Sequence, residues 1–354
     1  MEYTKLKYIN EYVSVSINPM KMPDTVFEMY SVPIYETGHP EYLRGNEIAS
    51  NKVIVRKNDI LLCKINPRIN RVWVVADESE HENIASSEWI VVRTSKYNPE
   101  FLAWYFRTPR FQRLMVSEVT GIGGSLTRAQ PKAVAEYPVP ILSRKEQDAI
   151  VRVLNRLHSV MDSRKKEMQK LDELIKARFV EMFGNEKNLM PISDICSIIT
   201  DGTHQPPKFR DTGIPFIFVS NITGDKVTYD AEKFIDQDTY DELIKRTPIE
   251  IGDVLLSTVG SYGHPAVVKS NKKFLFQRHI AYLKPRREII DSDYLHGAIL
   301  SPDAQRQIEE GVKGIAQKTL NLSEIKKMRI PVPDMNKQKE FATFSAQVDK
   351  SKVA

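Results

Sequence analysis

The chain has 354 residues, which is enough for two or three domains that each bury a core of their own. Hydrophobic residues make up 41% of it and charged residues 27%, as in a globular protein, and no apolar run approaches the roughly 20 residues that span a bilayer. No apolar signal segment follows Met1, and the two cysteines, Cys63 and Cys196, form no metal-binding spacing. We therefore expect a cytoplasmic protein in a reducing compartment, without a metal site.

Charge is distributed unevenly along the chain, although the net charge is only +5. Residues 254–287 contain no acidic residue but seven lysines and arginines, and residues 60–76 also lack acids. Basic segments without acids are typical of a surface that meets phosphates. A solvated basic face is the alternative that this pattern leaves open.

Residues 1–143 are predicted to form a mixed, mostly β domain. β-Branched and aliphatic runs bounded by turn residues predict strands at 52–56, 60–65, 72–76 and 89–94. A polar loop marked by proline, at 66–71, separates the second strand from the third. Helical spacing follows over 98–116, then a glycine-rich loop at 121–125 and an extended segment at 137–140 that contains two prolines.

A single long helix is predicted over residues 144–183, because no proline or glycine interrupts the run before Gly184. Apolar residues recur there in a seven-residue pattern, which favours pairing with a partner helix in a left-handed coiled coil. Forty residues at about 1.5 Å each give a rod of roughly 60 Å. An isolated amphipathic core helix is the alternative. The predicted seam consists of Ile150, Leu154, Leu157, Met161, Met168, Leu171, Ile175 and Met182.

Residues 186–336 repeat the plan of the first domain at an offset of 193 or 194 residues. The run Asp-Ile-Leu-Leu at 59–62 matches Asp-Val-Leu-Leu at 253–256. The run Pro-Val-Pro at 138–140 recurs at 331–333. Because landmarks of different kinds keep one offset, the sequence indicates an internal duplication.

The two domains differ in the loops that follow the matching strands. The loop at 64–71 carries lysine, asparagine and arginine, whereas its counterpart at 257–264 carries serine, threonine, tyrosine and histidine. A shared scaffold with divergent loops is expected of two binding modules with different ligands. Residues 337–354 begin a second helix, which we expect to be truncated, either because the natural chain is short or because this sequence stops early.

No pattern of catalytic residues accompanies these loops. The tetrapeptide Asn-Pro-Arg-Ile at 66–69 lacks the second proline and the aromatic residue of an amino-methyltransferase motif. The sequence also shows no GxxxxGK[ST] phosphate loop, no glycine-rich fingerprint between a strand and a helix, and no metal-binding histidine motif. We therefore predict that the chain is not itself an enzyme, and a self-contained methyltransferase is the weaker alternative.

Several stretches resemble the DNA-specificity subunit of type I restriction–modification systems. The similarity is most specific at 195–207 (ICSIITDGTHQPP), 213–222 (GIPFIFVSNI) and 252–257 (GDVLLS). It extends to the helix end at 177–185 and to the first-domain loop at 64–68, and it covers essentially the whole chain.

The resemblance implies an α+β fold of two tandem target recognition domains, at 1–143 and 186–336, related by pseudo-twofold symmetry. A long spacer helix at 144–185 joins such domains and pairs antiparallel with a second one, here truncated at 337–354. Each domain of such a subunit reads one half of a split double-stranded DNA site. Two methyltransferase subunits, which use S-adenosylmethionine, dock on this core, and endonuclease subunits that use ATP and Mg²⁺ join it. The chain itself is expected to bind no cofactor.

The resemblance directs attention to loop residues as the DNA-reading surface. Arginine and lysine suit guanine edges or phosphates, and short polar side chains suit base edges in the major groove. A surface residue without DNA contact is the alternative for each candidate, and a bivalent protein-binding scaffold is the alternative for the whole chain. The first-domain candidates are Lys64, Arg68, Arg71, Ser125, Thr127 and Arg128. The second-domain candidates are Thr203, His204, Lys208, Arg210, Ser220, Asn221, Ser261, Tyr262, Lys269, Lys272, Arg278, Gln317 and Lys318.

Overall fold

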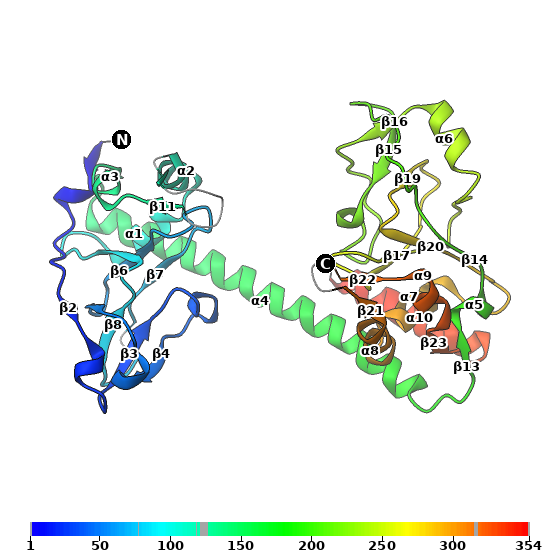
Figure 1. Cartoon of the computed structure of the whole chain (residues 1–354), viewed down its shortest axis with the longest axis horizontal. Helices are drawn as coiled ribbons and strands as arrows, with labels where there is room; N and C mark the ends of the chain where they lie inside the picture. Colours follow the sequence, from blue (N-terminus) through cyan, green and yellow to red (C-terminus); the bar gives the residue numbers. More distant parts are fainter. Residues whose placement is uncertain (1, 77, 118, 121–126, 315–317, 353–354) are drawn as a thin grey trace. The chain divides into compact units, whose positions relative to one another are not determined.

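The computed structural model describes residues 2–76, 78–117, 119–120, 127–314 and 318–352. The chain forms two compact units, Met1–Asp162 and Ser163–Ala354. The long helix α4 (Arg144–Phe183) begins in the first unit and ends in the second (Figure 1). Each unit is built around a central sheet with side chains packed on both faces.

The central sheet of the first unit has three strands in the order β7-β6-β9, so β6 (Ile60–Cys63) lies in the middle. Its neighbours β7 (Val72–Val74) and β9 (Trp89–Val92) both run antiparallel to it. Successive side chains point to opposite faces of a strand. Alternate residues of β6 therefore pack against helices on one side and against a tyrosine and tryptophan cluster on the other. Burial on both faces explains why β6 is uniformly apolar.

Helices cover one face of this sheet, and a second sheet covers the other (Figure 1). The helices are α1 (Pro99–Phe106), α2 (Pro109–Ser117) and α3 (Pro131–Val134). The second sheet contains, in spatial order, β2 (Ser16–Ile17), β5 (Lys52–Ile54), β8 (Glu82–Ala85), β3 (Val26–Tyr30) and β4 (Glu41–Arg44). Two antiparallel pairs are β1 (Tyr3–Lys5) with β12 (Pro138–Pro140) and β10 (Val119–Thr120) with β11 (Arg128–Ala129). Short 3-10 helices are η1 (Leu6–Tyr8), η2 (Pro19–Lys21), η3 (Tyr35–Thr37) and η4 (Gly45–Glu47).

The central sheet of the second unit is antiparallel, in the order β14-β20-β17-β18. Its strands are β14 (Cys196–Asp201), β20 (Ile280–Pro285), β17 (Val254–Ser257) and β18 (Pro265–Val267). All four residues of β17 are buried. Val254 and Leu256 belong to the core on the helical side, and Leu255 belongs to the core on the other side.

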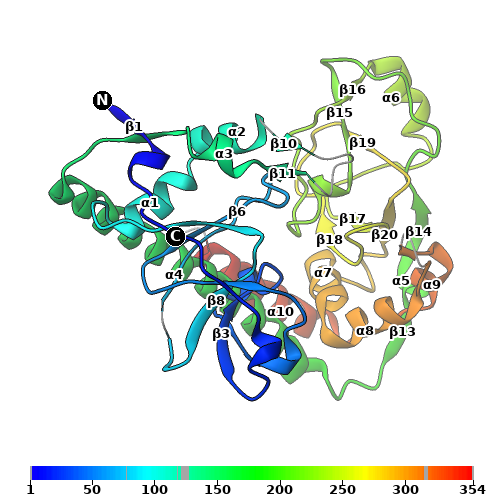
Figure 2. The ribbon, with the colours of Figure 1, turned by 60° about the vertical axis from the view of Figure 1, so that its left-hand side comes forward.

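Figures 1 and 2 both show this sheet between a helical layer and a smaller layer that contains a second sheet. The helical layer contains α5 (Ile192–Ile195), α7 (Ser292–Leu300), α8 (Pro302–Gly311), α9 (Leu322–Lys327) and α10 (Met335–Ser351). The smaller layer contains β15 (Ile214–Ile217), β16 (Phe234–Ile235), β19 (Leu275–Phe276), η5 (Val219–Asn221) and α6 (Gln237–Leu243). Two antiparallel pairs are β13 (Leu189–Pro191) with β23 (Arg329–Pro331) and β21 (Val312–Lys313) with β22 (Thr319–Leu320).

A buried carboxylate stands at the start of the middle strand in each unit. Asp59 accepts hydrogen bonds from the guanidinium of Arg93 at 2.6 and 2.7 Å, which raises the pKa of Arg93. Asp253 accepts a hydrogen bond from the hydroxyl of Tyr282 at 2.7 Å, and burial together with this carboxylate raises the pKa of Tyr282. Each carboxylate also accepts a bond at 2.8 Å from the backbone N–H three residues earlier. These matching contacts support the predicted duplication.

A buried glutamine ties the start of each long helix to its own unit. The side-chain oxygen of Gln147 accepts from the backbone N–H of Asn98 at 2.8 Å, and its amide donates to the carbonyl five residues earlier at 2.9 Å. Gln338 does the same with Asp291 at 2.8 Å and with the carbonyl five residues earlier at 2.8 Å. Asn98 and Asp291 are the N-caps of α1 and α7, so each glutamine joins two helix starts.

The four strands predicted in the first unit are confirmed as β5, β6, β7 and β9, each shorter than predicted. The helical stretch at 98–116 is two helices, because Arg107 and Thr108 separate α1 from the proline that starts α2. Strand β3 was not predicted, because its alternation is broken by Glu28. That carboxylate is buried and accepts a hydrogen bond from the hydroxyl of Ser79, 51 positions away, at 2.6 Å, a contact that only the fold supplies.

Helix α4 has the predicted bounds, and α10 packs antiparallel to its C-terminal part. The rings of Phe341 and Phe179 meet edge to face with centroids 5.2 Å apart. Further along α10, Lys352 pairs with Asp172 at 2.5 Å. Residue numbers therefore rise along one helix as they fall along the other. The predicted second helix is confirmed as α10.

The predicted seam of α4 has a covered and an exposed part. Ile175 and Met182 pack against the core of the second unit, and Leu154 and Leu171 are half-buried. The exposed members include Met161, whose exposed fraction is 61%. A coiled-coil partner for this exposed part stays a prediction. The exposed members are Ile150, Leu157, Met161 and Met168.

We predict that Gln338→Ala lowers the free energy of unfolding by about 3 kcal/mol. The change leaves the N–H of Asp291 and two carbonyls without their partner, and a buried unsatisfied group costs roughly 1–3 kcal/mol. Urea denaturation followed by circular dichroism measures the difference. Gln347→Ala, an exposed position on the same helix, is the control and should stay within about 0.5 kcal/mol of the wild type. Equal stability of both variants would contradict the assignment.

Candidate functional site

Three loops meet at one end of the central sheet of the second unit. The last residues of β14 and β17 pair with the first residues of β20, so β14 and β17 end where β20 begins. Residues 202–208 follow β14, residues 258–264 follow β17, and the turn 277–279 precedes β20. The N–H of Arg278 donates to the carbonyl of Thr203 at 3.1 Å, which joins two of these loops. Candidates that are far apart in sequence are thereby brought together.

The loop after β17 presents Ser261 and Tyr262 at this end. The hydroxyl of Tyr262 lies 3.0 Å from both carboxylate oxygens of Glu309 on α8. The ammonium of Lys318 lies 6.0 Å from the centroid of the Tyr262 ring. Gln305, also on α8, donates to a carbonyl of this loop at 2.9 Å and holds it against the helix. Tyr262, Glu309 and Lys318 thus form one polar cluster, and Ser261 is exposed next to it in the loop.

We call the loop after the middle strand, together with the helix and segment that hold it, the corner of a unit. The first unit builds its corner from different residues. The N–H of Asn66, in the loop after β6, donates to the carbonyl of Thr127 at 2.8 Å. Gln112 on α2 donates to the carbonyl of Pro67. It therefore ties the loop to the following helix as Gln305 does in the second unit. The predicted loop and the segment around Thr127 lie side by side.

The cations at this end of the first-unit sheet differ in their exposure. Arg128 forms an ion pair with Glu88 at 3.2 Å, and the hydrogen bond to this carboxylate raises the pKa of Arg128. Arg68 is exposed, and Lys64 and Arg71 are half-buried. Arg128 is therefore anchored within the unit, while the side chain of Arg68 is exposed.

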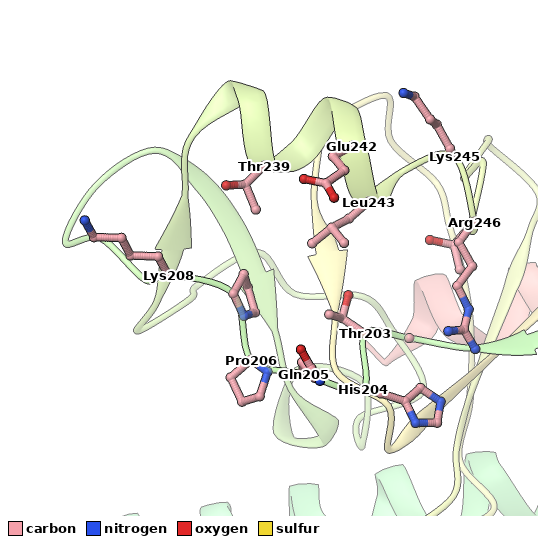
Figure 3. A pocket seen from close by; sticks show the side chains of 13 residues that line it. Thr203, His204, Gln205, Pro206, Lys208, Thr239, Glu242, Leu243, Lys245 and Arg246 are labelled. Atoms are coloured by element: carbon pink, nitrogen blue, oxygen red, sulfur yellow. The ribbon is translucent and has the colours of Figure 1, made fainter.

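A hollow of about 550 Å³ lies beside the end of β14 (Figure 3). Residues 202–208 form one side of it, and α6 with the residues after it, up to position 247, forms the other. Asp201 pairs with Arg246 at 2.5 Å and with the Nε2 atom of His204 at 2.8 Å. This one carboxylate therefore orients both side chains at the edge of the hollow.

The structure gives Asn221, one of the DNA-contact candidates, a role in the fold. Its side-chain oxygen accepts from the N–H of Phe218 at 3.0 Å, and its amide donates to the carbonyl of Asp230 at 3.1 Å. Only 8% of the residue is exposed. The neighbouring Ser220 is exposed. Because its polar atoms are engaged within the unit, Asn221 does not present a free edge to a base.

Carboxylates neutralise two further candidates, Arg210 and Lys269. Arg210 pairs with Asp236 at 2.6 Å, and hydrogen bonds from Thr239 together with this pair hold the pKa of Asp236 far below its usual range. Lys269 pairs with Asp293 at 2.5 Å. It also lies at the opposite end of the central sheet from the loop after β17, since it follows the end of β18. Both cations are therefore engaged by carboxylates within the unit.

The remaining candidates keep side chains that reach the surface. The ammonium of Lys272 lies 5.2 Å from the centroid of the Tyr229 ring. Ser125 and Gln317 lie outside the described residues. The exposed candidates of the second unit also include Lys208, Ser220 and Arg278.

The sequence pattern missed four residues of these corners: Glu88, Glu309, Lys245 and Arg246. The signal for a DNA-binding surface was a basic stretch without acidic residues, and such a signal excludes both glutamates. One signal for Glu309 was present, since Gln305 and Glu309 are four apart and share a helix face. Nothing in the sequence linked Arg246 to Asp201, because the contact joins two elements separated by 45 positions.

Neither a metal site nor a reactive thiol is evident in the described ranges. No three His, Cys, Asp or Glu side chains of those ranges gather closely enough to hold a metal ion. Both cysteines are free and buried, and burial raises the pKa of the Cys196 thiol to about 12. That thiol stays protonated near neutral pH and is a poor nucleophile. Over the same ranges, no helix has the length and apolar character needed to cross a membrane.

The fold and the loops at these sheet ends define a class of protein, a tandem recognition protein with two repeated α+β modules. In each module a loop after the middle strand is tied by a glutamine to the following helix. The frames match, whereas the polar side chains that they present differ. A continuous helix, α4, contributes residues to both modules.

Comparison with known proteins agrees with this class. Residues 185–354 match the family described as "Type I restriction modification DNA specificity domain". The specificity subunit of the type I restriction enzyme EcoBI from Escherichia coli is 23% identical over 285 residues, which cover 71% of this chain and 59% of that one. The MjaVIII specificity subunit from Methanocaldococcus jannaschii is 18% identical over an alignment of 367 residues, which covers 94% of this chain and 82% of that one.

Two solved structures share the fold over 99% of this chain and 90% of theirs. One comes from work on complex assembly and conformational transition of the type I R-M system, with a TM-score of 0.53 and 18% identity. The other is the type I restriction–modification S subunit from M. genitalium, with a TM-score of 0.50 and 12% identity. This chain is therefore similar to specificity subunits of type I restriction–modification systems over nearly its whole length. The match to EcoBI leaves about two fifths of that relative's length unmatched.

We predict that Asn221→Ala lowers the free energy of unfolding by about 2 kcal/mol, because buried hydrogen-bonding groups lose their partner. Ser220→Ala is the matched control, since its exposed side chain should change stability by no more than about 0.5 kcal/mol. Thermal and urea unfolding of both variants checks this difference. If the Asn221→Ala variant is as stable as the wild type, the structural role of Asn221 is contradicted.

Proposed function

We propose that this chain is the DNA-reading subunit of a type I restriction–modification enzyme, and that each unit reads one half of a bipartite double-stranded site. One observation carries the proposal. Equivalent loops, tied to equivalent helices by Gln112 and Gln305, present unlike polar side chains at equivalent sheet ends. Loops that differ on a common frame are suited to two different sequences. Because the proposed ligand is DNA, the proposed location is the bacterial or archaeal cytoplasm.

The first-unit corner is proposed to read its half-site with cations. An arginine such as Arg68 can donate two hydrogen bonds to O6 and N7 of guanine, which is worth about 1–3 kcal/mol of discrimination. Lys64 suits guanine or a flanking phosphate. Arg128, held by Glu88, supports the loop from the neighbouring strand.

The second-unit corner is proposed to read its half-site with hydroxyls and a carboxylate. Ser261 and Tyr262 offer short hydroxyl contacts beside Glu309. Phosphates repel a carboxylate, so Glu309 suits the exocyclic amino groups of cytosine or adenine. Lys318 beside Tyr262 limits the negative charge of this cluster. The two corners thus favour different base edges.

Helix α4 is proposed to set the spacing between the half-sites and to receive partner subunits. Its exposed apolar residues, among them Leu157 and Met161, suit an interface with another protein. The proposed partners are two methyltransferase subunits, which use S-adenosylmethionine, and endonuclease subunits, which use ATP and Mg²⁺. The chain itself is proposed to supply recognition and no cofactor.

A bivalent protein-binding scaffold is the rival function, and salt dependence separates the two. DNA binding releases counterions from phosphates, so its affinity should fall steeply as salt rises. Protein binding through apolar surfaces lacks this steep fall. The duplicated polar corners favour DNA, because their side chains match base edges and phosphates.

We predict that Arg68→Glu damages recognition of one half-site only. The reversed charge removes guanine or phosphate contacts of the first unit. Methylation of sites that contain the half-site read by this unit should fall at least tenfold. Glu309→Gln is the counterpart and should relax the base preference of the other half-site. Sequencing the methylated motifs of a host that carries each variant measures both effects. Equal damage to both half-sites by Arg68→Glu would indicate nonspecific phosphate binding instead.

We predict that deletion of residues 157–163 changes the spacing of the bipartite site and leaves its half-sites unchanged. Seven residues shorten an α-helix by about 10 Å, which corresponds to roughly three base pairs at 3.4 Å each. The deletion removes about two full turns, so the helix faces stay nearly aligned. The methylated motif of the variant gives the spacing directly. Altered half-site bases with an unchanged spacing would refute the role of α4.

A further inference from the structure

The hollow beside β14 is placed to meet a DNA backbone when the loop after β17 meets bases. In the central sheet, β20 alone separates β17 from β14. Two strand spacings amount to about 10 Å. The major groove is about 12 Å wide, so its edges lie roughly 6 Å from its middle. When the loop after β17 lies near the middle of the groove, the hollow beside β14, about 10 Å away, therefore lies over the phosphates at one edge of the groove.

The chemistry of the hollow fits phosphodiester oxygens. Its charged lining consists of three cations, Lys208, Lys245 and Arg246, and one carboxylate, Glu242. In Figure 3, Lys208 and Lys245 stand at opposite sides of the hollow. Threonine hydroxyls add hydrogen-bond donors for an anion. They come from Thr203, Thr239 and Thr247.

Lys208 and Lys245 have no neutralising partner among the described residues. Neither forms an ion pair or a hydrogen bond with another residue of the described ranges. Arg210 and Lys269, by contrast, are each paired with an aspartate. A cation that no carboxylate holds gives up no internal contact when it binds a phosphate, so these two lysines are the better phosphate ligands.

Arg246 is held in a fixed position at the edge of the same hollow. Asp201 binds its guanidinium at 2.5 Å and holds His204 from the other oxygen at 2.8 Å. A guanidinium has five N–H donors, so one bond to Asp201 leaves others for a second anion. The carboxylate thus orients Arg246 before any ligand arrives.

We infer that this hollow is a backbone clamp, a site for phosphodiester groups of duplex DNA that flank the half-site read by the second unit. Lys208 and Lys245 bind phosphates from its two sides, and Arg246 binds from its edge. The clamp sets affinity and register, and base choice stays with the loop after β17. The inference rests on the proposed DNA-reading function.

The experiment compares DNA binding by the complex of the chain with its methyltransferase subunits, as wild type and as the Lys208→Ala/Lys245→Ala variant. The probe is a duplex with the methylated motif of the host, and a duplex with scrambled half-sites accompanies it. Affinities are measured from about 50 to 300 mM salt. The slope of log affinity against log salt is negative, and each lost phosphate contact should make it less steep by about 0.9. Each loss should also weaken binding at 0.1 M salt about tenfold. The ratio between the two duplexes should stay unchanged.

Lys327→Ala is the matched control. Lys327 is an exposed lysine on α9 that pairs with Glu324 at 3.4 Å. The residue after it, Met328, accepts a hydrogen bond from the N–H of Ile192, shortly before the start of β14, so Lys327 lies at the other end of the central sheet from the hollow. This variant should bind as the wild type does. A double variant with the wild-type salt slope would overturn the clamp. So would a reduced amount of methyltransferase subunit in the complex with an unchanged slope, which would make the hollow a subunit contact. A wild-type complex that does not prefer its motif would instead overturn the proposed function.

Discussion

Both units depend on a carboxylate buried at the start of their middle strand. Asp59 is 1% exposed and Asp253 is fully buried, a position that is costly for a charge without partners. Arg93 neutralises the first, and Tyr282 with Lys284, whose ammonium is 3.4 Å away, accompanies the second. Because these contacts lock the middle strand to its neighbour, the far end of the strand is a fixed platform for a loop.

A fixed platform explains how one frame presents two chemistries. Loop residues tolerate replacement because few of their side chains are packed, whereas the glutamines and buried carboxylates cannot change without leaving polar groups unpaired. The first corner accordingly retains Lys64 and Arg68, while the second has Ser261 and Tyr262. Ion pairs within a unit mark the cations that have a structural role. Arg128, Arg210 and Lys269 are paired within their units, and pairing reduces what they offer to DNA.

The length and apolar repeat of helix α4 follow from its local sequence, whereas the burial of its apolar residues follows from tertiary contacts. Its length follows from forty residues without proline or glycine, and its apolar repeat follows from the sequence alone. Contact with α10 covers only the C-terminal part, where Phe179 meets Phe341. The exposed positions further along the seam obey the same repeat, so the sequence cannot distinguish a covered row from an open one.

The sequence by itself determined the internal repeat, the central strands and the long helix, because apolar periodicity, turn residues and a constant offset are local signals. It also located the loops that carry Arg68 and Tyr262. Only the tertiary structure decided which loop residues are available. Asn221 is buried, Arg210 is paired, and Lys245 joins Lys208 around a hollow, since these relations connect side chains from elements far apart in the chain. Propensity and spacing contain no information on such pairings, because long-range packing and electrostatics create them.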